Sequence, residues 1–317
     1  MQESLIFIGV DVSKASLSCA VEGSKAVHDL TNDAAAISAW LESQPVEALI
    51  AVESTGRYHR LLVTLAQARG HRTFVLNAQD VFFYARSLGC RGKTDRKDAC
   101  VIAHYLAEHH RLLRPWSPPP AMAEELRELL RCRAGVAHKQ MSLKMLLRHV
   151  ASLVSDAQLI DRQLDELLGS IDARISAVIA NDENLSCKCA NLRTITGIGL
   201  QGAAMLAALF TRITFRNAGA VVAYSGLDPR PCDSGSMTGR RRLSKRGDPL
   251  LRRQMYLAAF AATRSKALGP VYRALKTKGF KPTQAMVILA RKLLRIAWSL
   301  WNSGQRFNPA MLSSLGA

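Results

Sequence analysis

The sequence predicts an α/β unit followed by a basic, mainly helical unit, and three observations lead to this prediction. Short apolar runs alternate with amphipathic stretches over residues 5–76. The proline-rich segment Arg114-Pro-Trp-Ser-Pro-Pro-Pro120 then excludes a continuous helix. Beyond it the apolar spacing becomes helical. We expect a domain at residues 1–116, a helical hairpin or coiled coil at residues 121–182, and a C-terminal domain at residues 188–317.

Three strands are predicted to open the chain. Residues 5–10 form an apolar run typical of a strand buried on both faces, and residues 17–21 and 26–30 follow as hairpin neighbours. Alternating helices and strands are then expected at residues 34–41, 48–52, 58–68 and 73–76. Hairpin strands followed by such an alternation indicate a mixed sheet of the RNase H-like type.

The distribution of charge predicts an anionic partner. The chain carries 43 Lys and Arg against 25 Asp and Glu, a formal net charge of +18. Residues 1–110 hold 11 basic and 12 acidic side chains, whereas residues 111–317 hold 32 and 13. Clustered cations bind nucleic acid by releasing its counterions, so the second unit is expected to grip a polyanion. An anionic membrane surface and a merely basic protein are the alternatives.

The compartment is predicted from what the chain lacks. It has no apolar run of membrane-spanning length and no signal-peptide pattern at its start, so a cytoplasmic protein without a membrane partner is expected. Its 7 cysteines are odd in number and scattered, which argues against a disulfide framework. The pair Cys187-Lys-Cys189 has no second ligand pair at zinc-finger spacing.

Four carboxylates are the candidate metal ligands. Asp11 and Glu53 are expected to end the first and fourth strands, at the sheet edge where sites form in α/β proteins. Asp95 and Asp98 share one face of the first turn of a helix that runs to about residue 109. Oxygen ligands without His or Cys suit Mg²⁺, and a two-metal site would suit phosphoryl transfer. Alternatively, these residues are a helix cap and strand-end surface acids.

Between the predicted α/β unit and the basic C-terminal region, apolar residues recur at alternating spacings of three and four. The set is Met122, Leu126, Leu129, Val136, Leu143, Leu147, Val150 and Val154, with polar residues at Arg133 and Gln140. A second helix is expected at residues 159–179. This heptad pattern predicts a coiled coil that serves as a spacer and oligomerisation device, with packing inside one monomer as the alternative.

The basic region offers two kinds of phosphate contact. The segment around Gly197 and Gly199 has the spacing of a helix-hairpin-helix, whose main-chain N–H groups can hold a phosphate. Further along, a loop rich in hydroxyls, glycines and cations precedes a helix capped by Asp248. The candidate nucleic-acid-binding cations there are Arg240, Arg241, Arg242, Lys245, Arg246, Arg252 and Arg253.

Ser234 is the candidate nucleophile. Gly235 beside it permits a backbone that exposes the hydroxyl, and the surrounding guanidinium groups could neutralise charge at a reacting phosphate. A serine needs a base or a metal to become reactive, and no His lies nearby in sequence. The metal-binding acids would therefore act on the same phosphate. In the alternative, this is a flexible loop that only binds phosphates.

Several motifs together resemble one family of mobile-element enzymes. The motifs are Gly9-Val-Asp11-Val-Ser-Lys14, Glu53-Ser-Thr-Gly56-Arg-Tyr58, Lys93-Thr-Asp95-Arg-Lys-Asp98-Ala99, Ser234-Gly235 and Ser244-Lys245-Arg246-Gly247, with Asn77 as a weaker match. They resemble the DEDD transposases of insertion-sequence family one-hundred-and-ten, which have a RuvC-like N-terminal domain. A second pair, Ser225-Gly226, competes with Ser234-Gly235, but the Leu227-Asp-Pro229 that follows it favours a turn.

The resemblance implies that the protein is a DNA recombinase, a function that its composition alone does not show. Asp11, Glu53, Asp95 and Asp98 would bind the metal, and Ser234 would form a phosphoserine link to DNA. Donor and target DNA would be chosen by a bridge RNA, in a homo-oligomer, dimer or tetramer, in the bacterial cytoplasm near the nucleoid. A RuvC-like junction resolvase or nuclease that forms no covalent intermediate, and a non-catalytic nucleic-acid-binding protein, are the competing interpretations.

Overall fold

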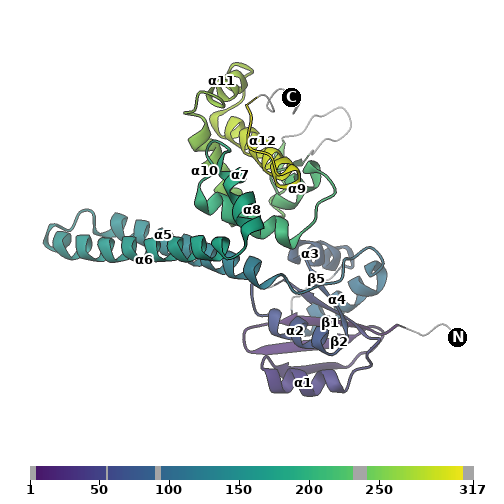
Figure 1. The fold of residues 1–317 in the computed structure, drawn as a ribbon. Coiled ribbons are helices and arrows are strands. Elements are labelled where there is room, and N and C mark those ends of the chain that lie inside the picture. Colours follow the sequence, from purple (N-terminus) through teal and green to yellow (C-terminus); the bar gives the residue numbers. More distant parts are fainter. Residues whose placement is uncertain (1–4, 55, 90–93, 231–240, 310–317) are drawn as a thin grey trace. The chain divides into compact units, whose positions relative to one another are not determined.

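The computed structural model describes residues 5–54, 56–89, 94–230 and 241–309. The chain divides into two compact units, Met1–Pro118 and Pro119–Ala317. The first unit is built around a sheet, and the second is mainly helical (Figure 1).

The first unit contains a five-stranded mixed sheet, as the sequence predicts. Its strands are β1 Phe7–Val12, β2 Ser16–Val21, β3 Val27–Thr31, β4 Leu49–Glu53 and β5 Arg72–Leu76, in the order β3-β2-β1-β4-β5. The first three strands pair antiparallel, and β4 and β5 continue parallel to β1. This arrangement is the one expected of an RNase H-like domain. The helices are α1 Ala34–Glu42, α2 Arg60–Ala68, α3 Ala78–Ser87 and α4 Asp95–His109.

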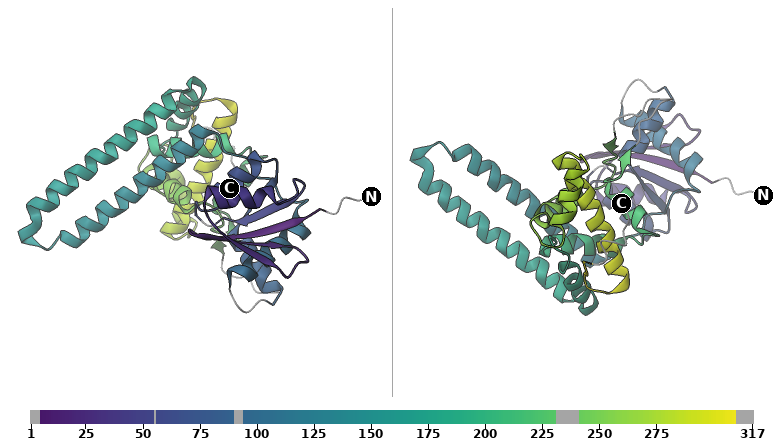
Figure 2. Two further views of the ribbon diagram at one scale, coloured as in Figure 1. Left: turned by 90° about the horizontal axis from the view of Figure 1, so that it is seen from below. Right: turned by 90° about the horizontal axis from the view of Figure 1, so that it is seen from above.

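Helices cover both faces of this sheet because successive strand residues point to opposite sides. On one face, Ile8, Val10 and Val52 belong to a core that includes residues of α1 and α2. On the other face, Ala51 and Phe74 pack with residues of α3 and α4. The two helical layers lie on either side of the sheet in Figures 1 and 2. In β1 and β4, every position before Asp11 and Glu53 is therefore apolar or glycine, as the sequence pattern indicates.

Gly9 is the point at which α4 meets the sheet. A Cβ atom added at Gly9 would lie 2.2 Å from the main-chain nitrogen of Ala103 and 2.2 Å from the carbonyl oxygen of Ala99. The helix backbone therefore rests directly on β1. At the start of β1, the Phe7 ring lies 4.9 Å from the His110 ring, just beyond the end of α4. These contacts make α4 antiparallel to β1, so the helix begins where the strand ends.

A charged contact holds the beginning of α4 against the antiparallel strands. Arg96 donates to Asp29 of β3 from Nε at 3.2 Å and from Nη2 at 2.9 Å. The same carboxylate accepts a 2.7 Å bond from the hydroxyl of Ser18 on β2. The bonds from Ser18 and Arg96 lower the pKa of Asp29, so this carboxylate stays charged. The link fixes the first turn of α4 over β2 and β3.

Two features of the first unit differ from the sequence expectation. The strand β1 continues through Val12, so Asp11 lies inside the strand instead of ending it. The helix α3 was not predicted from the sequence. Its signal was present in Asn77, whose side chain caps the helix by accepting a 2.9 Å bond from the Gln79 N–H.

The second unit begins with a helical hairpin made of α5 Ala121–Leu147 and α6 Val154–Ala180, joined by the short helix η1 Ala151–Leu153. The two long helices lie side by side in Figures 1 and 2. Arg133 and Gln140, the polar positions of the predicted heptads, bond across the hairpin. Arg133 forms a two-bond ion pair with Asp172 at 2.6 and 2.9 Å, and Gln140 donates to Asp161 and Asp165 at 2.8 and 2.7 Å.

The remainder of the second unit is a helical bundle. It consists of α7 Glu183–Arg193, α8 Leu200–Arg212, α9 Ala218–Ser225, α10 Pro249–Ala262, α11 Gly269–Thr277 and α12 Pro282–Ser303, with a two-stranded sheet of β6 Pro229–Arg230 and β7 Arg242–Leu243. Every residue of α8 from Gly202 to Phe210 is buried. The core also includes residues of α10 and α12. The helix α7 and the two short strands were not predicted from the sequence.

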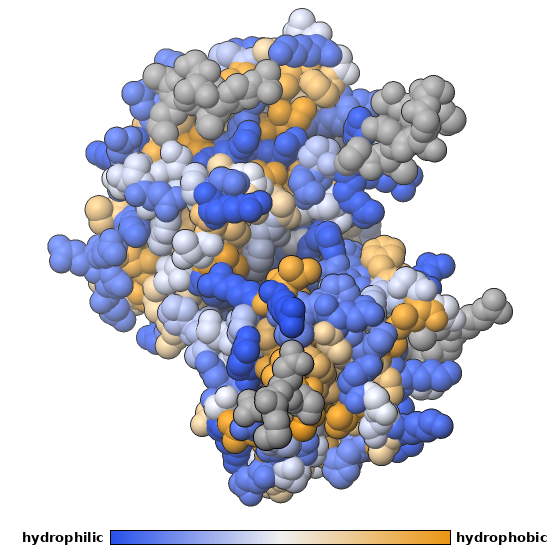
Figure 3. Space-filling model, turned by 90° about the vertical axis from the view of Figure 1, so that its right-hand side faces the viewer, coloured by the Kyte–Doolittle hydropathy of each residue, from blue (hydrophilic) through white to orange (hydrophobic). Residues whose placement is uncertain are grey.

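No helix in the described parts of the chain is long and apolar enough to cross a membrane. On the face shown in Figure 3, hydrophilic residues predominate and apolar residues form separate patches.

Replacing Gly9 with Ala should strongly destabilise the first unit, by about 3 kcal/mol, because the new methyl group would force α4 away from β1. Calorimetric unfolding of the full chain measures the effect. Gly135→Ala is the matched control. Gly135 lies inside α5 with nothing within 4 Å of an added Cβ, so that substitution should stabilise by about 0.5–1 kcal/mol. Equal unfolding temperatures for wild type and Gly9→Ala would contradict the close contact.

Replacing Arg133 with Met should destabilise the hairpin by about 1–3 kcal/mol, because Asp172 would keep only its bonds from Gln201. Arg174→Met provides the comparison. The Arg174 and Glu125 side chains are 63% and 41% exposed, against 26% and 25% for Arg133 and Asp172. Losing the Arg174–Glu125 ion pair should therefore lower the free energy of unfolding by less than about 1 kcal/mol. Urea unfolding followed by helical circular dichroism compares the two, and equal effects would argue against the buried pair.

Candidate active site

Asp11 and Glu53 lie side by side on the face of the sheet that α4 covers. Val10 of β1 is paired with Val52 of β4 in parallel register, so the next residue of each strand is one of these acids. Gly9 faces α4, and Asp11, two residues later, points to the same side. Ala51 belongs to the core under α4, which gives Glu53 the same direction. Both side chains are half-buried.

Asp95 and Asp98 lie in the first turn of α4, at the same end of β1. Thr94 caps this helix, and its hydroxyl accepts a 3.3 Å bond from the Lys97 N–H. Because α4 runs antiparallel to β1, its first turn lies where the strand carrying Asp11 ends. Asp95 is exposed and Asp98 half-buried. The positive end of the helix dipole favours carboxylates in this turn.

An open cavity of about 420 Å³ lies beside this turn. It is lined by Ser16, Ser18, Asp29, Thr94, Asp95 and Arg96. Arg96 and Asp29 were not predicted as site residues, because an ion pair between residues so far apart in the chain leaves no local sequence pattern. The pair gives the acidic edge one positive group.

The four acids share an edge without forming a closed coordination sphere. Among the residues that the structure describes, no three His, Cys, Asp or Glu side chains form a group that could hold a metal ion. Their chemistry nevertheless suits a hard divalent cation, because all four offer only oxygen. Asp80, in the first turn of α3, is a further half-buried acid that follows the neighbouring strand β5. Neither Asp80 nor α3 was predicted from the sequence.

Ser234 and Arg240 lie outside the described residues. In the sequence, they fall between β6 and β7, whose register pairs Pro229 with Leu243 and Arg230 with Arg242. Just before β6, the Asp228 side chain accepts a hydrogen bond from the buried hydroxyl of Ser244. The Ser244 N–H also donates to the Asp228 carbonyl at 3.0 Å. The Ser-Lys-x-Gly motif thus starts with a structural serine.

Two glycines bring the chain before β6 and the chain after β7 into main-chain contact. Gly226 ends α9 in the left-handed conformation, φ 69°, and a Cβ there would lie 2.7 Å from the Arg246 nitrogen. A Cβ at Gly247 would lie 2.0 Å from the Tyr224 carbonyl oxygen. Arg252 of α10 donates to the carbonyl oxygens of Ser225 and Gly247. Its guanidinium group therefore links the segment before β6 to the segment after β7.

Ser225, the alternative candidate for the catalytic serine, lies at this contact between the two segments. Its side chain is fully buried, and its hydroxyl donates to the Val222 carbonyl at 2.7 Å and accepts from the Leu227 N–H at 3.3 Å. The predicted turn at Ser225-Gly226 is confirmed.

The two glycines of the predicted helix-hairpin-helix have different environments. Gly197 has φ 94°, and a Cβ there would lie 2.2 Å from the carbonyl oxygen of Ala258 in α10. Its close main-chain approach is therefore to another helix. Gly199 caps the start of α8 and is exposed, with nothing within 4 Å of an added Cβ.

The candidate phosphate-binding cations are mostly exposed. Exposed side chains belong to Arg241, Arg242, Lys245, Arg246 and Arg253, while Arg252 is half-buried. Lys245 has φ 54°, a left-handed conformation that is unusual for a residue other than glycine.

A second group of cations, on α12, was not predicted from the sequence. Burial, followed by repulsion from Arg295, lowers the pKa of Arg291, and the same two causes lower the pKa of Lys292. The Nε of Arg291 is buried and has no hydrogen-bond partner among the described residues. Half-buried cations that repel one another suit an anionic ligand.

Comparisons with known proteins agree with these two units. Residues 8–155 match a model of the DEDD transposase domain of IS110 elements, and residues 189–274 match a model described as the transposase IS116/IS110/IS902 family. DEDD transposases in general depend on divalent metal.

Three relatives illustrate the similarity. A pilin gene-inverting protein of Moraxella bovis is 28% identical over 81% of this chain and 81% of its own length. An uncharacterized 42 kDa protein of insertion element IS900 from Mycobacterium paratuberculosis is 24% identical over 96% of this chain and 98% of its own. A putative transposase of Sinorhizobium fredii is 31% identical over 39% of this chain and 33% of its own.

The acidic sheet edge, the basic helical unit and the two matched regions lead to one assignment. The chain belongs to the IS110 family of insertion-sequence transposases, enzymes that recombine DNA.

Proposed function

We propose that this transposase cuts and rejoins DNA through a phosphoserine intermediate on Ser234, assisted by Mg²⁺ at Asp11, Glu53, Asp95 and Asp98, with its DNA sites chosen by a bridge RNA. The observation that carries the proposal is the common position of the four acids. Asp11 and Glu53 are neighbours on the face under α4, and the first turn of α4 lies at the same strand end.

The metal proposal draws on the kind of ligand that these residues offer. A divalent cation at the four carboxylates would supply positive charge to a phosphate in the reaction. The half-buried positions of Asp11, Glu53 and Asp98 limit the hydration of their carboxylates. The open cavity beside Asp95 leaves this edge accessible to a large substrate.

The proposed covalent step exchanges one phosphate ester for another. The Ser234 oxygen forms a bond to phosphorus as the bond from phosphorus to one deoxyribose oxygen breaks. The serine proton leaves to a base, and the released sugar oxygen takes up a proton. The reverse attack by a sugar hydroxyl of another strand restores the serine and joins the DNA. No energy source is required, because the number of phosphate ester bonds is unchanged.

The distribution of positive charge supports a role for nucleic acids beyond the cut strand. The excess of basic residues lies after residue 110, and it includes the exposed arginines and the cations of α12. Such charge binds phosphates without reading bases. Base pairing to a guide RNA would supply the missing sequence selection, and the resemblance to bridge-RNA systems favours this source.

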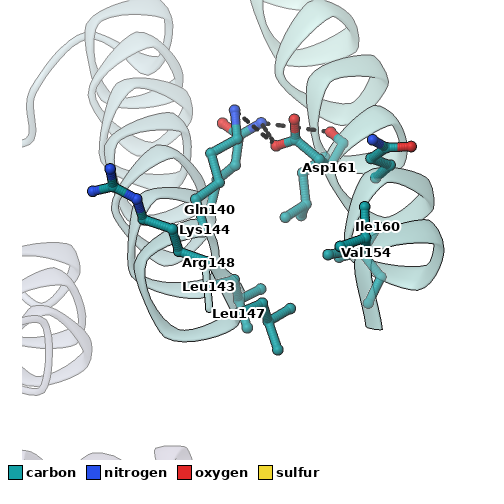
Figure 4. A pocket seen from close by; sticks show the side chains of 11 residues that line it. Gln140, Leu143, Lys144, Leu147, Arg148, Val154, Ile160 and Asp161 are labelled. Carbon is teal, nitrogen blue, oxygen red and sulfur yellow. Dashed lines mark hydrogen bonds and ion pairs between the residues drawn. The ribbon is translucent and has the colours of Figure 1, made fainter. Parts of the chain in front are cut away.

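The hairpin offers a surface for a second copy of the chain. Near its tip, large apolar side chains are exposed: Met141, Met145, Leu146, Val150, Leu153, Val154, Leu159, Ile160 and Leu167. Between the helices, an apolar cavity of about 250 Å³ lies beside the Gln140, Lys144 and Asp161 contacts (Figure 4). Because the hairpin cannot cover these side chains itself, we infer that they mediate a homo-oligomer, dimer or tetramer.

The chemistry is tested by searching for a protein–DNA adduct on denaturing gels. The reaction contains the element ends, the RNA encoded beside the gene and Mg²⁺, with wild type compared with Ser234→Ala and Asp11→Ala. Wild type should form the adduct, and both variants should lose it, because one lacks the attacking oxygen and the other a metal ligand. Ser225→Ala is the matched serine control. It should retain the adduct in proportion to its folded fraction, since the Ser225 hydroxyl is buried in a structural bond.

The competing interpretation predicts a different pattern. A RuvC-like resolvase would nick DNA without an adduct, would remain active as Ser234→Ala and would lose activity as Asp11→Ala. That pattern would reject Ser234 as the nucleophile. Unchanged activity in every variant would reject catalysis at this site.

The hairpin interface is tested by sedimentation of the purified protein. Charges placed at the tip in Met145→Glu/Leu146→Glu should shift the protein toward monomer, because both side chains are at least 70% exposed and apolar. The control is Leu257→Glu, an exposed leucine on α10. An unchanged oligomeric mass in the tip variant would place the interface elsewhere.

A further inference from the structure

The solvent face of α3 carries two exposed aromatic side chains. The opposite face of this helix is anchored by buried Val81 and by Tyr84 and Ala85, which pack on the core under α4. Phe82 and Phe83 each remain 56% exposed. Each of these rings leaves an apolar surface in water without contributing to that core.

The two rings form a small, ordered group with one cation. Their centroids lie 5.5 Å apart, and their planes meet at 70°, an edge contact that leaves much of each ring exposed. The Arg86 guanidinium lies over one face of the Phe82 ring, 5.7 Å from its centroid. Exposed aromatic rings beside a guanidinium group are the elements from which proteins build stacking sites for nucleic-acid bases.

The position of α3 places this group near the acidic edge. The helix starts at Ala78, directly after β5, and Leu76 of that strand is paired with Glu53. Phe82 and Phe83 follow four and five residues later. At a rise of about 1.5 Å per residue they lie about 6–8 Å along the helix axis from its start. A strand held at the acids could therefore extend its bases toward these rings.

The charge of this unit makes such a contact useful. Residues 1–110 hold 11 basic and 12 acidic side chains, so this part of the chain has no general attraction for phosphates. Stacking on an aromatic ring needs no positive charge and works with every base, at about 1–3 kcal/mol per base. It supplies a way for a near-neutral unit with a carboxylate cluster to hold a polyanion.

We propose that Phe82 and Phe83, with Arg86, form a stacking platform for unpaired nucleobases of the nucleic-acid strand held at the acidic edge. The proposal rests on the proposed function, since it assigns a binding role beside that same site. A protein partner fits less well, because standard protein interfaces bury about 800 Å² on each side. The exposed large apolar residues of α3 are only this pair, followed by Leu88.

The test uses a single-stranded oligonucleotide that carries 5-iodouracil, with binding followed by fluorescence anisotropy and by photocrosslinking. Phe82→Leu/Phe83→Leu keeps apolar side chains but removes the ring faces, and it should bind roughly tenfold more weakly. Phe82→Tyr/Phe83→Tyr should bind like wild type. In wild type, peptide mapping should locate crosslinks at residues 82–83. The control Leu112→Ala removes another exposed apolar side chain of the same unit, 85% exposed, and should change nothing.

Equal binding by wild type and the leucine variant, with crosslinks mapping outside α3, would overturn the platform. A change in sedimentation without a change in oligonucleotide binding would overturn it in favour of a second protein copy. The adduct assay separates this proposal from the chemistry. Ring-dependent binding supports the platform whether or not Ser234 forms an adduct, and an adduct without ring-dependent binding removes the platform alone.

Discussion

The first unit depends on the main-chain contact between Gly9 and α4. Only a residue without a Cβ allows the helix backbone to approach β1 so closely. The contact fixes the height of α4 above the sheet, and the Phe7–His110 contact fixes its direction. Asp95 and Asp98 consequently lie near the strand end that bears Asp11, although more than eighty residues separate them in the sequence. Arg96 then secures this end through Asp29.

The sequence predicts those parts of the fold whose information is local. Apolar runs identify all five strands of the first sheet, and helical spacing identifies α4, α5 and α6. The helices α3 and α7 were missed because the signal at the start of each is a single polar residue, Asn77 or Asp182, and because α7 has weak apolar periodicity. The strands β6 and β7 contain only two residues each, too few for any pattern.

The candidate site was predictable as a set of residue types and motifs, but not as an arrangement. Asp11 and Glu53 were found because each directly follows an apolar run, although β1 continues one residue past Asp11. The ion pair of Arg96 with Asp29 and the contact of Gly226 with the 245–247 segment join distant residues, and neither leaves a sequence pattern. The role of Gly197 also depended on context, since a glycine that admits a phosphate and one that admits a helix look the same in a sequence.

The polar contacts inside the hairpin constrain how its length can change. Arg133 meets Asp172, and Gln140 meets Asp161 and Asp165, so residues farther along α5 meet residues earlier in α6. A shift of one helix by a turn would set these charged and amide groups against apolar neighbours. Insertions or deletions in this hairpin should therefore occur as matched heptads in both helices. The length of the hairpin can therefore change only in fixed steps of about 10 Å, one heptad at a time.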